Sequence, residues 1–150
     1  MNNNYFSEFK IIGSTVKSIK IKNDFLSLNN NNDMKRTIDI SHLVGNTELI
    51  DDGKTFFGTI ILNIKVKISQ KKKKYDLDMS IEGCFKAPIE IGEDTFKDML
   101  EVNGIASLYS IARGFVQSTS SQTLLSGSVL LPLINAIEYS RNMSEKNKES

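Results

Sequence analysis

The sequence predicts an α+β domain in which a four-stranded antiparallel sheet is followed by C-terminal helices. The first observation is the alternation of apolar and polar residues in segments between residues 5 and 82. The second is a change of pattern after Pro88 and Gly92, where apolar residues recur at spacings of three and four. The third is the order of the segments, because strands that all precede the helices favour an antiparallel sheet over alternating βαβ units.

The predicted strands differ in how clearly they alternate. The first covers residues 5–22 and is clearest at 18–22, and the second covers 35–43. The third and fourth, 60–68 and 75–82, carry large apolar residues on one side and mostly lysine, aspartate and serine on the other. A period of two gives each strand one buried face and one solvated face.

The last two strands are expected to pair as a hairpin with its tip at Lys71 and Lys72, within a run of four consecutive lysines that we place in solvent. This register matches apolar with apolar residues and lysine with aspartate: Val66 with Leu77, Ile64 with Met79, Lys67 with Asp76 and Lys65 with Asp78. Burial and charge therefore favour the same pairing.

Helical spacing begins after the sheet. A short helix is expected over residues 94–100, with Asn103-Gly104 as its stop signal. A longer helix begins near Ile105, and a last helix covers 134–141. The longer helix has one apolar stripe, with Ile111 at its edge: Ile105, Leu108, Tyr109, Ala112, Phe115 and Val116.

Size and charge narrow the class of protein. The 150 residues suit one domain over 1–150, with residues 1–4 and 143–150 expected to be disordered. Lys plus Arg is 19 and Asp plus Glu is 18, so no global charge recruits nucleic acid or an anionic membrane. The single cysteine, Cys84, cannot form an internal disulfide. Without an apolar run long enough for a signal sequence or a membrane span, we expect a soluble cytoplasmic protein with no membrane insertion.

Residue types that serve catalysis are scarce. His42 is the single histidine and lies at the end of a predicted strand. Cys84 lies beside Phe85, where we expect a small core or interface residue. His42 and Cys84 make no metal-ligand spacing, and the glycines form no phosphate-binding loop. We therefore expect no enzyme, no cofactor and no metal ion.

The C-terminal half contains a series of short motifs between Gly83 and Tyr139. They are Gly83-Cys84-Phe85, then Ile105-Ala106-Ser107-Leu108-Tyr109, then Ala112-Arg113, then Leu130-Leu131-Pro132-Leu133-Ile134-Asn135. In these motifs and their spacing the chain resembles the SecB family of protein-export chaperones. It departs from the family at Ser110-Ile111, where the family has Pro-Tyr, and at Asn135, which is one residue late.

The resemblance implies a SecB-like fold and an oligomer. Chains of this family assemble as homotetramers, dimers of dimers, with the long helices at the interface. This implies four interface residues here: Leu108, Ile111, Phe115 and Val116.

The resemblance also implies a groove that binds non-native polypeptides between the first crossover loop, the sheet and the final helix. The candidates on the crossover side are Phe25, Leu26, Leu28 and Met34. Those on the other side are Val129, Leu130, Leu131, Leu133 and Ile137. Ordinary core packing is the alternative for each of these residues.

The sequence does not identify which polypeptide the chain would bind. The resemblance implies an ATP-independent holdase for unfolded or precursor polypeptides. A chaperone dedicated to one antitoxin of a toxin–antitoxin system, or an assembly protein of the same fold, are the alternatives. In the family, an acidic patch on the exposed sheet face docks the export motor SecA, whereas the corresponding strand here carries Lys65 and Lys67. SecA and an antitoxin are both candidate partners.

Overall fold

The structure, a computed structural model, describes residues 7–28 and 34–149 of the chain. Its strands are β1(Lys10–Asn23), β2(Met34–Val44), β3(Glu48–Ile50), β4(Thr55–Gln70) and β5(Lys73–Pro88). Its helical elements are η1(Ile89–Ile91), α1(Glu93–Met99), η2(Leu100–Gly104), α2(Ile105–Thr123) and α3(Ala136–Glu149). The predicted class, an antiparallel sheet followed by helices, is confirmed, and β3 is an addition to the four predicted strands.

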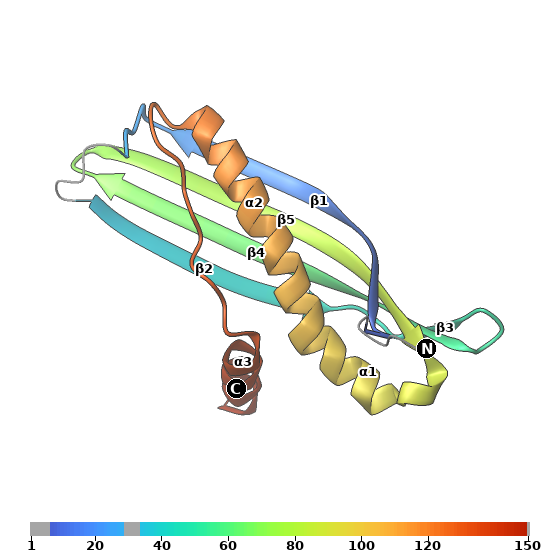
Figure 1. The fold of residues 1–150 in the computed structure, drawn as a ribbon. Helices are drawn as coiled ribbons and strands as arrows, with labels where there is room; N and C mark the ends of the chain where they lie inside the picture. The colour runs from blue at the N-terminus through green and yellow to red at the C-terminus, as the bar shows by residue number, and fades with distance from the viewer. Residues whose placement is uncertain (1–6, 29–33, 150) are drawn as a thin grey trace.

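The long strands are antiparallel and lie in the order β1-β5-β4-β2, with β3 paired to the beginning of β4 (Figure 1). The predicted hairpin register is confirmed, since Val66 lies opposite Leu77 and Lys65 opposite Asp78. The two-residue turn falls at Lys71 and Lys72, as expected. Lys71 has a φ of 56°, the left-handed conformation that short hairpin turns require.

Alternation along β4 and β5 separates a buried face of the sheet from a polar face. The inward side chains of β4 from Ile60 to Val66 are fully buried beneath the helices, while Lys65 and Lys67 face outward and are exposed. Burial of a large apolar side chain contributes roughly 1.5–3 kcal/mol, far more than an exposed ion pair. The period-two pattern therefore decides which face the helices cover.

A nearly continuous helical path, α1, η2 and α2, crosses the buried face (Figure 1). The predicted stop at Asn103-Gly104 is wrong, because the π-helical turn η2 joins α1 to α2 there. Gly104 has a helical φ of −63°, and a Cβ at this position would lie 2.9 Å from Cδ1 of Ile60. The glycine thus permits close approach of helix and sheet rather than ending the helix.

After α2 the chain returns across the helix-covered side as an extended stretch, residues 124–135, which we call the crossing segment (Figure 1). It leads into α3, which begins at Ala136 and continues to Glu149. The helix therefore extends beyond the predicted 134–141 and includes 143–149, which we expected from the sequence to be disordered, while residues 1–4 and 150 lie outside the described residues. Within the described part of the chain, no helix has the length and apolar character needed to cross a bilayer.

Candidate functional site

The crossing segment is held against α2 by two side chains of that helix. The hydroxyl of Tyr109 donates to the carbonyl of Pro132 at 2.5 Å. Nε of Arg113 donates to the carbonyl of Leu131 at 2.9 Å. Buried backbone groups need hydrogen-bond partners, and side chains of α2 supply them here. These contacts fix the path of the crossing segment over the sheet.

The beginning of the crossing segment is tied to the loop that follows β1. The N–H of Leu125 donates to the carbonyl of Leu26 at 2.9 Å, and the N–H of Leu28 donates to the carbonyl of Ser126 at 3.0 Å. The hydroxyls of Ser27 and Ser126 are also hydrogen-bonded to each other. The two sides of the predicted groove, the crossover loop and the crossing segment, therefore meet at this end of the molecule.

From Val129 to Pro132, side chains of the crossing segment point alternately into the core and out to solvent, and Leu133 is exposed as well. Val129 and Leu131 are fully buried, and the N–H of Val129 donates to the buried hydroxyl of Ser120 at 2.7 Å. Leu130 is 55% exposed and Leu133 is 82% exposed. Because the backbone is held in place, Leu130 and Leu133 are displayed to solvent as fixed apolar side chains.

Ile137, on α3, is also exposed to solvent, at 60%. We call Leu130, Leu133 and Ile137 the apolar row. On the same side of the sheet, the edge strand β2 contributes half-buried apolar residues at the border of the core: Met34, Ile38 and Ile40. At the β2 edge of the sheet, the helix-covered side therefore has apolar side chains that are only partly covered, and we call them the margin of β2.

An aromatic pair fixes α3 to β2. Nδ1 of His42 lies 2.8 Å from the hydroxyl of Tyr139, and the ring centroids are 5.3 Å apart. Burial lowers the pKa of His42 below its ordinary value of 6.5, and the charge of Glu101 acts in the opposite direction. Burial also raises the pKa of Tyr139. The neutral pair is therefore favoured, and it ties α3 to β2.

The predicted groove residues are not all on the surface. Three are fully buried, so their assignment to client contact is corrected to core packing: Leu26, Val129 and Leu131. Leu28 and Met34 are half-buried and pack against the core. Phe25 is 73% exposed and has a left-handed φ of 56°.

Sequence reasoning missed Leu125, which is 65% exposed and directly follows the buried Leu124. The N–H of Leu125 is bound to the residue after Phe25, so both lie at the junction of the crossover loop and the crossing segment. The Leu124-Leu125 pair has no periodic context that would say which of the two faces solvent. The sequence shows that Leu125 is apolar, but no pattern in it indicates that the side chain is exposed.

Two of the four predicted interface residues face the chain's own sheet. Leu108 and Val116 are fully buried in the core, so their assignment to subunit contacts is corrected. Ile111 and Phe115 lie on the outward side of α2, 42% and 37% exposed. The stripe predicted for this helix was too wide, because at about 100° per residue these two positions turn away from the sheet.

The residues with catalytic potential are not brought together. His42 lies opposite Leu62 on the helix-covered side of the sheet, whereas Cys84 lies opposite Thr59 on the other side. Over residues 7–28 and 34–149, no group of three His, Cys, Asp or Glu side chains is placed to hold a metal ion.

No protein-family model matches this chain, and no curated protein matches it either. Among solved structures it is similar to the Rv1957 SecB-like chaperone of Mycobacterium tuberculosis, solved in complex with a ChAD peptide from the Rv1956 HigA1 antitoxin. That likeness has a TM-score of 0.63 at 11% identity, over 85% of this chain and 90% of the other. A protein of unknown function from Streptococcus agalactiae aligns with a TM-score of 0.46 at 14% identity, over 83% and 96% of the two chains. The first of these likenesses shows that the chain has a SecB-like fold.

Proposed function

We propose that this chain is an ATP-independent, non-enzymatic holdase chaperone that binds unfolded or precursor polypeptides through the apolar row. The observation that carries the proposal is the exposure of Leu130 and Leu133 on a segment held by α2 and by the loop after β1, and of Ile137 on α3. Large apolar side chains that are close in sequence and kept in solvent are typical of a surface that contacts another chain. Each contributes roughly 1.5–3 kcal/mol when a client buries it, without any demand on client sequence.

Two further features support the proposal. Phe25 and Leu125 add exposed apolar area at the far end of the crossing segment. The half-buried margin of β2, with Ile38 and Ile40, adds apolar area on the same side of the sheet. The proposal includes assembly as a cytoplasmic homotetramer, with Ile111 and Phe115 in the contacts between subunits. The likeness to a SecB-like chaperone supports it at the level of the fold.

Suppression of aggregation tests the proposal. A denatured model client is diluted into buffer with an equimolar amount of the chain, and turbidity is followed. The wild type is expected to keep the client soluble. The Leu130→Ser/Leu133→Ser/Ile137→Ser variant is expected to lose most of this activity while keeping its circular dichroism spectrum, because the changed side chains are exposed.

The matched control changes three apolar residues outside the row: Ile12→Ser/Leu43→Ser/Leu49→Ser. These residues are 52%, 65% and 55% exposed, so the control removes a similar apolar area from β1, β2 and β3. It is expected to protect the client as the wild type does. Failure of the wild type to protect the client, or equal loss in both variants, would contradict the proposal.

A second candidate is a chaperone dedicated to one antitoxin, and the peptide bound to the Mycobacterium tuberculosis neighbour favours it. Capture of bound proteins from the native cells separates the two. Many unrelated clients support the general holdase, and SecA in the same capture supports a role in export. One dominant partner of the antitoxin class supports the dedicated chaperone.

A further inference from the structure

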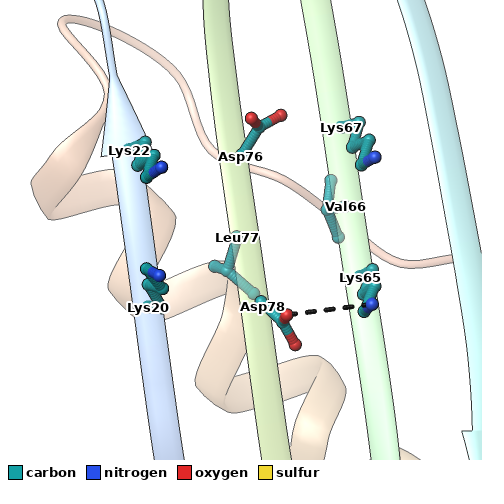
Figure 2. A pocket seen from close by; sticks show the side chains of 8 residues that line it. All are labelled: Lys20, Lys22, Lys65, Val66, Lys67, Asp76, Leu77 and Asp78. Carbon is teal, nitrogen blue, oxygen red and sulfur yellow. Dashed lines mark ion pairs between the residues drawn. The ribbon is translucent and has the colours of Figure 1, made fainter.

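The polar face of the sheet carries its charges as rows that cross the strands at one end. Strand register defines two rows: Lys22, Asp76 and Lys67, and Lys20, Asp78, Lys65 and Asp39. Figure 2 shows the hollow that these rows line, with lysines of β1 and β4 on either side of the two aspartates of β5. Nζ of Lys65 lies 4.0 Å from the carboxylate of Asp78.

Positive charge continues from these rows onto the turn between β4 and β5, whose lysines are all exposed. We call this region the basic end. Among the residues that the structure describes, its lysines outnumber its aspartates: Lys20, Lys22, Lys35, Lys65, Lys67, Lys71, Lys72, Lys73 and Lys74 against Asp24, Asp39, Asp76 and Asp78. Since the whole chain has a formal charge of +1, the net charge conceals this local field.

The far end of the sheet is acidic on balance, although the exposed Lys10 and Lys86 pair there. The turn after β3 and the helices η1 and α1 are mostly acidic, apart from Lys54 and Lys97: Asp51, Asp52, Glu90, Glu93, Asp94 and Asp98. The charges of the molecule are therefore sorted along the length of the strands. A sorted charge of this kind steers and orients a charged partner.

We propose that the basic end binds an acidic polypeptide segment in extended conformation, at a site separate from the apolar row. Lys20 and Lys22 are two residues apart on β1, which is about 6.6 Å along a strand, and Lys65 and Lys67 repeat this spacing on β4. Alternate side chains of an extended peptide have the same spacing. Carboxylates at every second position of the partner therefore meet successive lysines of one strand.

The same pattern favours a peptide over nucleic acid. The two lysine columns are about 9.6 Å apart, and Asp76 and Asp78 lie between them. A phosphate backbone carries a charge at every nucleotide and would be repelled by these aspartates, whereas a peptide can place neutral residues beside them. The adjoining row consists of small polar residues rather than aromatic side chains that stack on bases: Ser18, Ser80, Asn63 and Ser41.

Fluorescence anisotropy of the full chain with a labelled peptide of alternating Glu and Ser tests the proposal. Binding is expected at low salt and is expected to weaken as salt rises. The Lys20→Gln/Lys22→Gln/Lys67→Gln variant is expected to raise Kd about tenfold, as the loss of three exposed ion pairs implies. All three lysines are exposed, so the fold is expected to survive the change.

The matched control removes three exposed lysines elsewhere: Lys54→Gln/Lys146→Gln/Lys148→Gln. Its Kd is expected to change less than about twofold.

No binding of the alternating peptide, or equal weakening in both variants, would overturn the proposal. Tighter binding of a single-stranded oligonucleotide of the same charge would assign the surface to nucleic acid instead. If the chain dimerises at low salt and the Lys20→Gln/Lys22→Gln/Lys67→Gln variant does not, the partner of the basic end would instead be the acidic far end of a second copy of this chain.

A peptide with the same composition but its Glu residues in one block tests the spacing, and it is expected to bind more weakly than the alternating peptide. An uncharged apolar client peptide tests the separation of the two sites. The acidic peptide is expected to stay bound when the apolar row is saturated, and displacement would overturn the separation. The direct binding of the acidic peptide and its loss in the lysine variant do not depend on holdase activity, so the two proposals can fail independently.

Discussion

Nε of Arg113 donates a hydrogen bond to the backbone carbonyl of Leu131, and Tyr109, one helical turn earlier, donates to the carbonyl of Pro132. Two side chains of α2 thus hold consecutive peptide groups of the crossing segment. Both belong to the motifs that carry the resemblance to SecB. Their structural role is to hold the segment so that Leu130 and its neighbours in the apolar row face solvent.

Removal of the Arg113 contact is expected to loosen the crossing segment. Arg113→Ala should lower the free energy of unfolding in urea by about 1.5–3 kcal/mol, because a carbonyl loses a charged donor. Amide hydrogen exchange in residues 128–134 should accelerate. Arg141→Ala, an exposed arginine on α3, is the control and should change stability by less than about 0.5 kcal/mol. Equal losses in the two variants would contradict a holding role for Arg113.

Close packing of α2 on the sheet predicts a second effect. A Cβ at Gly83 would lie 2.6 Å from Cδ2 of Leu108, so Gly83→Ala should lower the free energy of unfolding by about 1–3 kcal/mol. Gly114 is helical on the outer side of α2 and has no neighbouring atom within 4 Å of such a Cβ. Gly114→Ala should instead raise stability by about 0.5–1 kcal/mol. Thermal unfolding of both variants measures the contrast, and a neutral Gly83→Ala would contradict the packing.

The sheet was predictable because two independent patterns fix the same register. Val66 opposite Leu77 satisfies burial, and Lys65 opposite Asp78 satisfies charge, so a shift by one residue would break both. Strand β3 was not predictable, since Glu48–Ile50 is too short to show alternation. It forms because β4 extends beyond the end of β2 and offers an unpaired edge.

The helical half was less predictable, for two physical reasons. Gly104 reads as a helix stop in the sequence, but contact with Ile60 explains the missing side chain, and only the tertiary structure shows that contact. The polar residues 143–149 read as a disordered tail, although the glutamates and lysines among them are good helix formers.

For the candidate surface, the sequence identified the apolar residues but did not distinguish the exposed ones from the buried ones. In residues 129–133, all but Pro132 are apolar, so no periodicity distinguishes Leu130 from Leu131. Their difference comes from the hydrogen bond that Arg113 makes to the backbone, which sets the rotation of the segment. Sequence patterns identify apolar segments, whereas long-range contacts decide which side chains remain outside.

The half-buried pair of His42 and Tyr139 predicts that stability depends on pH. Burial lowers the pKa of His42 in the folded chain, while in the unfolded chain it returns to about 6.5. Between these two pKa values the unfolded chain binds more protons. The free energy of unfolding should therefore fall as pH drops through about 6.5, and level off below the folded pKa. Urea unfolding at several pH values between about 5 and 8 measures this slope.

His42→Gln is the control, because it removes the titrating group from the same position. The slope between about pH 5 and 7 should flatten in this variant, since the sequence contains a single histidine. The ring C–H signals of that histidine should also report its folded pKa directly by NMR, below 6.5. A folded pKa at or above 6.5, or the same slope in His42→Gln, would contradict the role of burial.

The outward side of α2 predicts an effect on assembly. Ile111 and Phe115 lie one turn apart, partly exposed, and a second chain that packs there would bury both. Ile111→Glu would place an unpaired charge in that contact, so the mass measured by light scattering should fall toward the 16.8 kDa of one chain. Gln117→Glu adds the same charge at an exposed position on another side of the helix and should leave the mass unchanged. A monomeric wild type, or an Ile111→Glu variant of undiminished mass, would show that α2 does not hold the subunits together.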